Sequence, residues 1–263
     1  DGRDGVAALT AALDDGPVVV SGCQHLYERR IGGFDRLDAV LGAFANADSP
    51  VVTGWNRYAW AYLAAVRDTA ADFPTVAEAG PVVAADLADL LLERYGEPPA
   101  FAADEVADRP VVAVRRYPVG LGSRRVSVPV PVPGGWGDRS GSEVDPADLV
   151  FERLAAVSEG NVGVATALWE RSGAEAVRPG DVGTPVDDLA LDRDAAFCLR
   201  VVLAKERVRR TELDAVVGGG ADLNRLLGRL ARDGVVTRED GLVELDPAAV
   251  PAAARATERG RVL

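Results

Sequence analysis

The sequence predicts an α/β fold, and the prediction rests on two strand–helix units near the N-terminus. In the first unit, the apolar residues 17–20 precede Ser21-Gly22-Cys23-Gln24, and helical spacing follows from Phe34. In the second unit, Val51-Val52-Thr53 leads to Asn56 and then into an aromatic and alanine-rich helix. Two consecutive strand–helix units indicate a parallel sheet whose strand ends share one edge. Because ligands collect at that edge in open α/β sheets, we expect functional residues there.

Hydrophobic periodicity predicts the other elements of this first domain, residues 1–82. Apolar spacing predicts a helix over residues 4–13, and Asp14-Asp15-Gly16 ends it. The triplet Val18-Val19-Val20 favours a strand buried on both faces. Helices are expected at 34–45 and 57–66, and residues 75–77 are a further candidate strand.

Residues 83–178 are predicted to form a mainly helical domain with an insertion. Amphipathic spacing predicts helices at residues 84–95, 146–157 and 162–172. The last two helices are separated by a break that contains Gly160 and Asn161. The insertion, residues 100–141, differs in kind, because its apolar residues alternate with period two and predict a β-hairpin.

Residues 187–263 follow a proline-containing linker at 179–185 and are predicted to form a third domain. Helical patterns are expected at residues 191–203, 210–217 and 223–232. Two short strands, 235–238 and 242–245, flank the Asp240-Gly241 turn. Three helices followed by a hairpin indicate a winged-helix arrangement, which a last helix at 248–258 would complete.

The composition of the chain indicates the salt conditions and the cellular location in which the protein works. The chain has 263 residues, a formal net charge of -12 and a pI of about 4.7, and Lys205 is its only lysine. Acidic excess with lysine depletion is typical of haloarchaeal proteins adapted to high salt; the alternative is an ordinary acidic cytosolic protein. Two cysteines form no disulfide framework and no apolar run approaches a transmembrane helix, so we expect a cytoplasmic location without a membrane segment. Because the sequence begins with Asp1 and contains no methionine, we expect it to be a fragment or a trimmed chain.

The order of these features resembles the C-terminal half of an AAA+ or related STAND-type P-loop ATPase. The matching features are a strand with a polar end, a strand followed by Asn56, helices around the Gly160-Asn161 break, and a winged helix. The resemblance implies a partial P-loop NTPase-like core with a helical lid, and ATP and Mg²⁺ as cofactors. It also implies that Asn56 is the catalytic sensor that hydrogen-bonds the γ-phosphate or the attacking water. The nucleotide would lie against Ser21, Gln24, Gly160 and Asn161.

Three positions of this sequence depart from the family pattern in ways that bear on a possible ATPase activity. The chain contains no G-x-x-x-x-G-K-[ST] motif, so a Walker A segment is expected upstream of Asp1. Ser21 stands where the family has its metal-holding aspartate, so no metal ligand is predicted. Gly163 stands where an arginine would serve as a second sensor. Two functions follow: an ATP-binding conformational switch that recruits a partner, or a degenerate interaction protein that does not turn over nucleotide.

Some of these side chains have a simpler structural interpretation. Asn56 is also a good helix N-cap, and one residue can serve both purposes. The aromatic residues Trp55, Tyr58, Trp60 and Tyr62 could stack on a base, but aromatics at helical spacing are more often core residues.

The third domain carries an alternative function, that of a winged-helix DNA-binding transcriptional regulator. The recognition helix and wing would present polar and basic side chains to DNA, namely Asn224, Arg225, Arg229, Arg232 and Arg238. Between Asp187 and Leu263 there are 13 basic and 14 acidic residues, so most of the negative charge lies elsewhere. The competing interpretation is a module that binds an unknown protein partner or mediates self-association.

Overall fold

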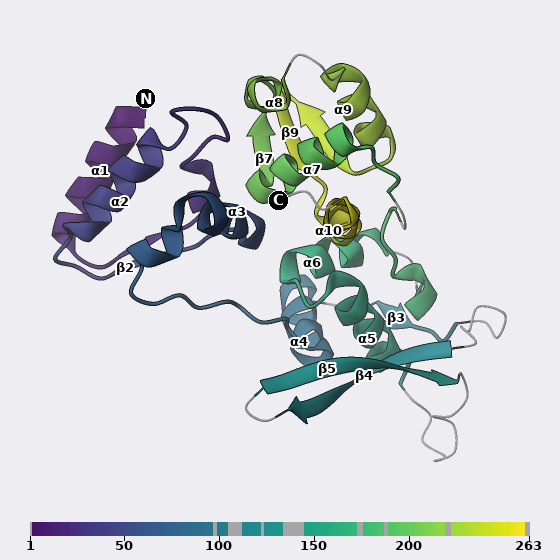
Figure 1. The fold of residues 1–263 in the computed structure, drawn as a ribbon. Coiled ribbons are helices and arrows are strands. Elements are labelled where there is room, and N and C mark those ends of the chain that lie inside the picture. Colours follow the sequence, from purple (N-terminus) through teal and green to yellow (C-terminus); the bar gives the residue numbers. More distant parts are fainter. Residues whose placement is uncertain are drawn as a thin grey trace. The chain divides into compact units, whose positions relative to one another are not determined.

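The computed structural model describes most of the chain, namely residues 2–96, 99–104, 112–121, 124–133, 145–172, 176–186, 189–218 and 222–260. The chain divides into two compact units (Figure 1). One unit joins Asp1–Gly80 to Thr184–Leu263, and the other is Pro81–Gly183. Both units combine helices with short strands, so the predicted α/β class is confirmed.

The N-terminal part of the first unit contains the two predicted strand–helix units. Its elements are α1 (Gly2–Asp15), β1 (Val18–Val20), η1 (Cys23–His25), α2 (Asp35–Ala45), β2 (Val51–Thr53), α3 (Arg57–Arg67) and η2 (Thr69–Asp72). Strands β1 and β2 pair in parallel with Val18 opposite Val51 and Val20 opposite Thr53. Beneath them, Tyr27, Leu37 and Leu63 are fully buried in a small apolar cluster.

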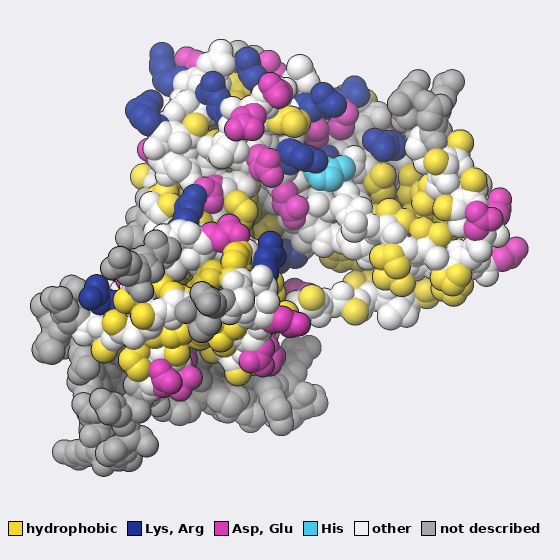
Figure 2. Space-filling model, turned by 180° about the vertical axis from the view of Figure 1, so that it is seen from behind, with side chains coloured by type: hydrophobic (Ala, Val, Ile, Leu, Met, Phe, Trp, Pro, Cys, Tyr) yellow, Lys and Arg dark blue, Asp and Glu magenta, His cyan; other side chains and the backbone are white. Residues whose placement is uncertain are grey.

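The prediction that β1 is buried on both faces is wrong. Val19 is 77% exposed and its neighbour Val52 is 61% exposed, whereas the residues flanking each are half-buried. Side chains alternate between the faces of a strand, so these two valines share one face of the sheet. Figure 2 shows hydrophobic side chains exposed on this N-terminal part, at the right of the view. The run of three valines therefore reflects β propensity rather than burial on both faces.

The C-terminal part of the first unit is a helical group with a small antiparallel sheet. Its elements are α7 (Arg193–Lys205), β7 (Arg207–Arg209), α8 (Arg210–Val217), α9 (Leu223–Arg232), β8 (Val236–Glu239), β9 (Leu242–Leu245), η5 (Pro247–Ala249) and α10 (Val250–Arg259). The strand order is β7-β9-β8, with both pairs antiparallel. The predicted hairpin is present, and its turn is formed by Asp240 and Gly241 at positive φ.

Helix α7 is the centre of the first unit. From Cys198 to Lys205 every residue is buried. Its apolar residues form a core with α8, α9, β8, β9 and α10, and the helix also contacts α3 of the N-terminal part (Figure 1). A helix with apolar contacts all round is expected in an interior position. Helix α7 therefore joins the two sequence-distant parts of this unit.

The second unit packs three helices around aromatic residues. Its elements are α4 (Ala84–Tyr95), β3 (Ala100–Phe101), β4 (Val112–Leu121), β5 (Arg124–Pro133), α5 (Pro146–Ser158), α6 (Val162–Arg171), β6 (Ala176–Val177) and η4 (Pro179–Asp181). Phe151 and Trp169 stack with their ring centroids 5.4 Å apart, and Phe101 lies against both rings. Strands β4 and β5 form the predicted antiparallel hairpin, whose tip lies outside the described residues.

One predicted element is absent. Residues 75–77 were expected to form a strand, but the structure has no strand there, and Val76 is 55% exposed. A short extended segment with neither pairing partner nor burial does not form a ladder. Among the described residues, no helix is long and apolar enough to cross a membrane.

Candidate functional site

The carboxyl ends of β1 and β2 lie side by side, as the sequence predicts. Their pairing continues past the strands, because Gly54 N donates to Val20 O at 2.8 Å and Cys23 N donates to Gly54 O at 3.1 Å. These two bonds fix the loop after β1 against the loop after β2. Gln24 and Asn56 are thereby brought to one edge of the sheet.

Asn56 is engaged at both ends of its amide. Its Oδ1 accepts hydrogen bonds from Tyr58 N at 2.8 Å and Ala59 N at 3.3 Å, so it is the N-cap of α3. Its Nδ2 donates to Glu206 Oε1 at 2.8 Å and to Leu203 O at 3.2 Å. The capping interpretation is confirmed, and the donor end of the amide faces an anionic group.

Gln24 points to the same anion from the neighbouring strand end. The side chain is buried, with 6% of the residue exposed, and Nε2 donates to Glu206 Oε2 at 3.3 Å. Each oxygen of the Glu206 carboxylate therefore accepts one amide hydrogen bond from a different strand end. The predicted pair does converge on one point, and Glu206 occupies that point.

Glu206 was not predicted from the sequence. It follows α7 directly and lies 150 residues from Asn56 in the chain, so no local pattern connects the two. The only local signal is the absence of glycine at the end of this helix, where positive φ commonly requires one. Glu206 has φ 62° and ψ -50°. From this turn its side chain accepts hydrogen bonds from Asn56 and Gln24.

Lys205, the residue before Glu206, makes further contacts at the junction where the end of α7 meets the N-terminal part of the unit. Its ammonium group donates to Tyr27 O, lies 3.2 Å from Glu212 Oε1 and sits 4.3 Å from the centroid of the Tyr27 ring. Burial lowers the pKa of Lys205, and the nearby Glu212 carboxylate opposes that shift. Burial also raises the pKa of the Tyr27 phenol to about 12. The chain's only lysine thus joins the N-terminal and C-terminal parts of the unit.

Charged side chains of both signs influence His25, which follows β1 in the chain. His25 is exposed, yet partial desolvation of its ring lowers its pKa. The charges of Lys205, Arg207 and Arg36 act in the same direction, while Glu206 opposes them. The pKa of His25 therefore responds both to these cations and to the Glu206 carboxylate.

Ser21 lies exposed at the end of β1, next to Gly54. No carboxylate is supplied at this position, because the residues after β1 are Ser21-Gly22-Cys23-Gln24. Within the described ranges, no group of three histidine, cysteine, aspartate or glutamate side chains could hold a metal ion. The carboxylate that reaches this edge is that of Glu206, and both of its oxygens already accept hydrogen bonds from Asn56 and Gln24.

Gly160 and Asn161 belong to the second unit, where both have structural roles. Asn161 Oδ1 accepts from Val164 N at 3.1 Å and so caps α6. Gly160 has φ 71°, and its carbonyl accepts from Val82 N at 2.9 Å. The predicted grouping of these two residues with the strand ends stays a prediction.

The aromatic residues of α3 pack inward. Tyr58 and Tyr62 lie against the buried cluster of Tyr27, Leu37 and Leu63, and the Tyr27 and Tyr62 rings stack at 5.7 Å. Two guanidinium groups cover the rings: Arg29 lies 3.8 Å from the Tyr62 centroid, and Arg200 lies 5.0 Å from the Tyr58 centroid. Arg200 comes from α7, so Tyr58 contributes to the same junction as Asn56.

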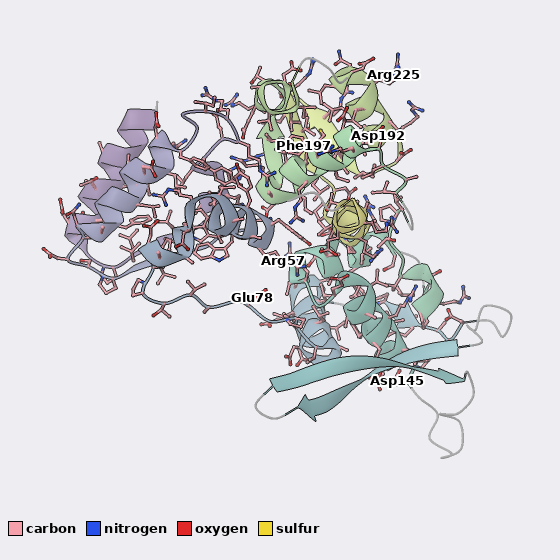
Figure 3. All side chains as sticks on the ribbon, viewed as in Figure 1. Arg57, Glu78, Asp145, Asp192, Phe197 and Arg225 are labelled. Atoms are coloured by element: carbon pink, nitrogen blue, oxygen red, sulfur yellow. The ribbon has the colours of Figure 1, made fainter. Side chains whose placement is uncertain are left out.

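The predicted DNA-contact residues gather on the exposed side of α9. The helix buries Leu223, Leu226, Leu227 and Leu230. Asn224, Arg225 and Arg232 are exposed, and Arg229 is half-buried. In Figure 3, Arg225 extends from the outer side of α9. Arg238 of β8 is also exposed and reaches α9, where a Cβ on Gly228 would meet its Nη1 at 3.8 Å.

Two acidic residues partly balance this basic surface. Arg225 Nε lies 3.4 Å from Asp222 Oδ2, and Arg229 Nη2 lies 3.9 Å from Asp192 Oδ2. The Arg225 side chain remains 86% exposed despite its ion pair. Exposed ion pairs of this kind contribute little and exchange readily with other partners.

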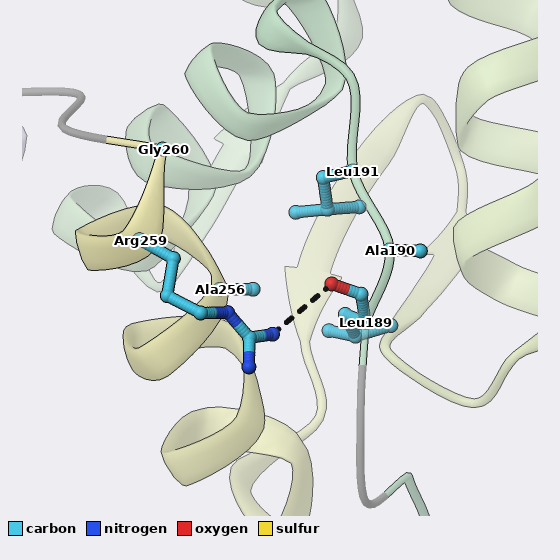
Figure 4. Close-up of a pocket in the computed structure, with 6 residues that line it drawn as sticks. All are labelled: Leu189, Ala190, Leu191, Ala256, Arg259 and Gly260. Atoms are coloured by element: carbon cyan, nitrogen blue, oxygen red, sulfur yellow. Dashed lines mark hydrogen bonds between the residues drawn. The ribbon is translucent and has the colours of Figure 1, made fainter.

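A shallow pocket lies elsewhere in the C-terminal part, between α10 and the segment before α7 (Figure 4). It has a volume of about 430 Å³ and is lined by Leu189, Ala190, Leu191, Ala256, Arg259 and Gly260. Arg259 Nη2 donates to Leu189 O across it at 3.3 Å. None of the predicted site residues lines this pocket.

Comparison with known proteins gives no family for this chain. Family models, curated proteins and solved structures were compared with it, and none of them matches. The functional argument therefore rests on the geometry of the described residues.

Proposed function

We propose that this chain is the sensor and effector portion of an ATP-binding, AAA+/STAND-like conformational switch. The observation that carries the proposal is the convergence of Gln24 Nε2 and Asn56 Nδ2 on the two oxygens of one carboxylate. Two amide donors at adjacent strand ends have the geometry needed to bind an anionic oxygen group. A nucleotide phosphate presents oxygens of the same kind, so the pair can report its presence.

The arrangement of elements supports the same proposal. Strands β1 and β2 are parallel and each is followed by a helix, as in the sensor half of a P-loop core. In the C-terminal part, the order α7, β7, α8, α9, β8, β9 and the sheet order β7-β9-β8 support the winged-helix arrangement that the proposal assumes. The junction at Lys205 and Glu206 couples this domain directly to the strand ends.

Nucleotide hydrolysis is not part of the proposal. Phosphoryl transfer requires a phosphate cradle, Mg²⁺ and a positioned water. Ser21 supplies no carboxylate at the end of β1, and the Glu206 carboxylate is hydrogen-bonded by Asn56 and Gln24. The chain's own residues bind and orient an anion, and the phosphate cradle would have to come from another segment or chain.

Nucleotide titration of the intact protein tests the proposal. We expect ATP to bind, and Asn56→Ala and Gln24→Ala to weaken binding by about tenfold each, since each removes a hydrogen bond to a charged group. Asn46→Ala is the matched control, because Asn46 Nδ2 donates only to Gly42 O, at the end of α2 remote from the strand ends. Absent binding, or equal affinity in all four proteins, would contradict the proposal.

A second candidate function, DNA binding, is favoured by the exposed basic side of α9. The recognition helix of a winged-helix domain presents such residues to the major groove. Arg225→Ala/Arg229→Ala should weaken DNA binding and reduce the slope of log affinity against log salt, because phosphate contacts release counterions. Arg57→Ala, an exposed arginine on α3, is the control. If the wild-type protein shows no salt-dependent DNA binding, α9 does not have this function.

A further inference from the structure

The Glu206 carboxylate is bound by two amide donors at the strand ends, as an anionic ligand would be. Its carboxylate is contacted on Oε1 by Asn56 Nδ2 at 2.8 Å and on Oε2 by Gln24 Nε2 at 3.3 Å. Gln24 is buried, whereas Glu206 is exposed. The Gln24 donor is therefore held inside the fold, whereas the Glu206 residue that it contacts is accessible to solvent.

The backbone at Glu206 is in an uncommon conformation. Its φ of 62° and ψ of -50° lie close to the γ-turn with positive φ, which is rare and strained for residues other than glycine. The turn is tied on both sides, because Glu206 N donates to Val202 O at 2.7 Å and Leu245 N donates to Glu206 O at 2.8 Å. Strain of this kind persists only where the surroundings over-determine it, and it concentrates at sites that change conformation.

The electrostatic surroundings suit an anion at this point. Lys205, Arg207 and Arg36 are close enough to the strand ends to act on His25. The Lys205 charge lies in the buried junction directly before Glu206 in the chain. An anion that replaced the Glu206 carboxylate would meet the same two amide donors.

We infer that Glu206 is the resident anion of a phosphate site, and that a nucleotide phosphate bound at Gln24 and Asn56 displaces it. Displacement removes the hydrogen bonds that link both strand ends to Glu206, at the junction of α7 with β7. The C-terminal part is then held to the N-terminal part by Lys205, by the bond from Asn56 Nδ2 to Leu203 O and by the packing of α7 on α3. With fewer links, its position becomes responsive to ligand. The inference rests on the proposed switch function and assigns its regulation to one carboxylate.

Substitutions of Glu206 test whether its carboxylate competes with a phosphate for the two amide donors or only stabilises the fold. Glu206→Gly removes the carboxylate and suits the positive φ, so this variant is expected to fold. Glu206→Gln keeps the length of the side chain and removes the charge. Glu239→Gln, at an exposed position in β8, is the matched control for the loss of one negative charge.

ATP and inorganic phosphate are titrated into each protein, and hydrogen exchange is followed over residues 203–209. We expect Glu206→Gly to bind ATP about tenfold more tightly than the wild type, with Glu206→Gln between them and Glu239→Gln unchanged. ATP should accelerate exchange at 203–209 in the wild type and leave it unchanged in Glu206→Gly. Equal ATP affinity in Glu206→Gly and the wild type would overturn the inference while leaving the switch function intact.

Inorganic phosphate distinguishes failure of the inference from failure of the proposed function. If ATP binds to none of the proteins, the proposed function is wrong. Phosphate binding to Glu206→Gly that is lost in Glu206→Gly/Gln24→Ala would still support an anion site that Glu206 occupies. If Glu206→Gly binds neither ATP nor phosphate, there is no such site and the inference is wrong as well.

Discussion

At the scale of single residues, Asn56 stabilises the protein through both ends of its side-chain amide. Its Oδ1 caps α3, and its Nδ2 bonds Glu206 and the end of α7. We expect Asn56→Ala to lower the free energy of unfolding by about 2–3 kcal/mol, from the cap and from a hydrogen bond to a charged group. Urea denaturation measures the change.

Two further variants divide the effect of Asn56 into its parts. Asn161→Ala removes a cap alone, because Asn161 Oδ1 accepts from Val164 N at the start of α6, and it should cost about 1 kcal/mol. Asn56→Asp keeps an acceptor for the cap but places a second carboxylate against Glu206. Its loss in the free energy of unfolding should therefore lie between the losses for Asn161→Ala and Asn56→Ala. Equal losses for Asn56→Ala and Asn161→Ala would show that the contact with Glu206 contributes nothing to stability.

The buried thiol of Cys198 should make the folded protein less stable at alkaline pH. Burial in the core around α7 raises its pKa from 9.0 to about 12, and no other cause contributes. An unfolded chain loses this proton near pH 9, whereas the folded chain retains it, so the stabilisation is complete below pH 9 and falls as the pH rises toward 12. The slope approaches about 1.4 kcal/mol per pH unit for one such group.

Unfolding measured between pH 8 and pH 10.5 checks this expectation. Cys198→Ala should show a shallower decline than the wild type, whatever its stability at neutral pH. Cys23, whose pKa is raised to about 11, contributes in the same sense, while Lys205, whose pKa is lowered by burial, acts in the opposite sense. An unchanged slope in Cys198→Ala would show that this thiol is not protected in the folded protein.

At the scale of elements, the helices followed from the sequence closely. The hydrophobic spacing of residues 84–95, 146–157 and 223–232 predicted helices that the structure contains. Short apolar runs were harder to interpret, because burial of residues 18–20 and pairing of residues 75–77 depend on neighbours distant in the sequence. The Glu206 contact was beyond prediction for the same reason: it joins residues 24, 56 and 206 through the packing of α7 on α3.

The turn between α5 and α6 contributes to the stability of the second unit, because Gly160 packs closely against residues 81–82. A Cβ on Gly160 would lie 2.6 Å from Pro81 Cβ and 2.7 Å from Val82 N, and the backbone φ is +71°. Gly160→Ala should therefore destabilise this unit by at least about 2 kcal/mol, from the positive φ and the clash with backbone. Loss of hydrogen-exchange protection in α5 and α6 measures it.

Gly163 is the matched control for this turn. It lies in the first turn of α6, and a Cβ there would meet Asn161 Oδ1 at 3.4 Å, a tight contact with a side chain rather than with backbone. Gly163→Ala should be neutral or stabilise by up to about 1 kcal/mol, because alanine favours the helix. If Gly160→Ala behaves like Gly163→Ala, the approach of residues 81–82 to this turn does not stabilise the unit.

At the scale of the whole molecule, charge is the property that all elements share. The formal net charge is -12, and many of the carboxylates are exposed, among them Asp14, Asp15, Asp48 and Asp86. Repulsion among exposed charges opposes the compact state and is screened by salt, with a Debye length of about 10 Å at 0.1 M and about 3 Å at 1 M. We therefore expect the thermal midpoint of unfolding to rise as KCl increases from 0.1 to 1 M.

A charge-reduced variant separates screening from general effects of the solution. Asp14→Asn, Asp15→Asn, Asp48→Asn and Asp86→Asn, combined in one protein, remove four exposed negative charges that make no contact with Glu206. This variant should be more stable than the wild type in low KCl, and the difference should shrink toward 1 M because screening already removes the repulsion there. Sucrose stabilises by exclusion from the surface rather than by screening, so it should raise both proteins equally. A wild-type midpoint that does not depend on KCl would contradict the interpretation of the acidic surface as an adaptation to high salt.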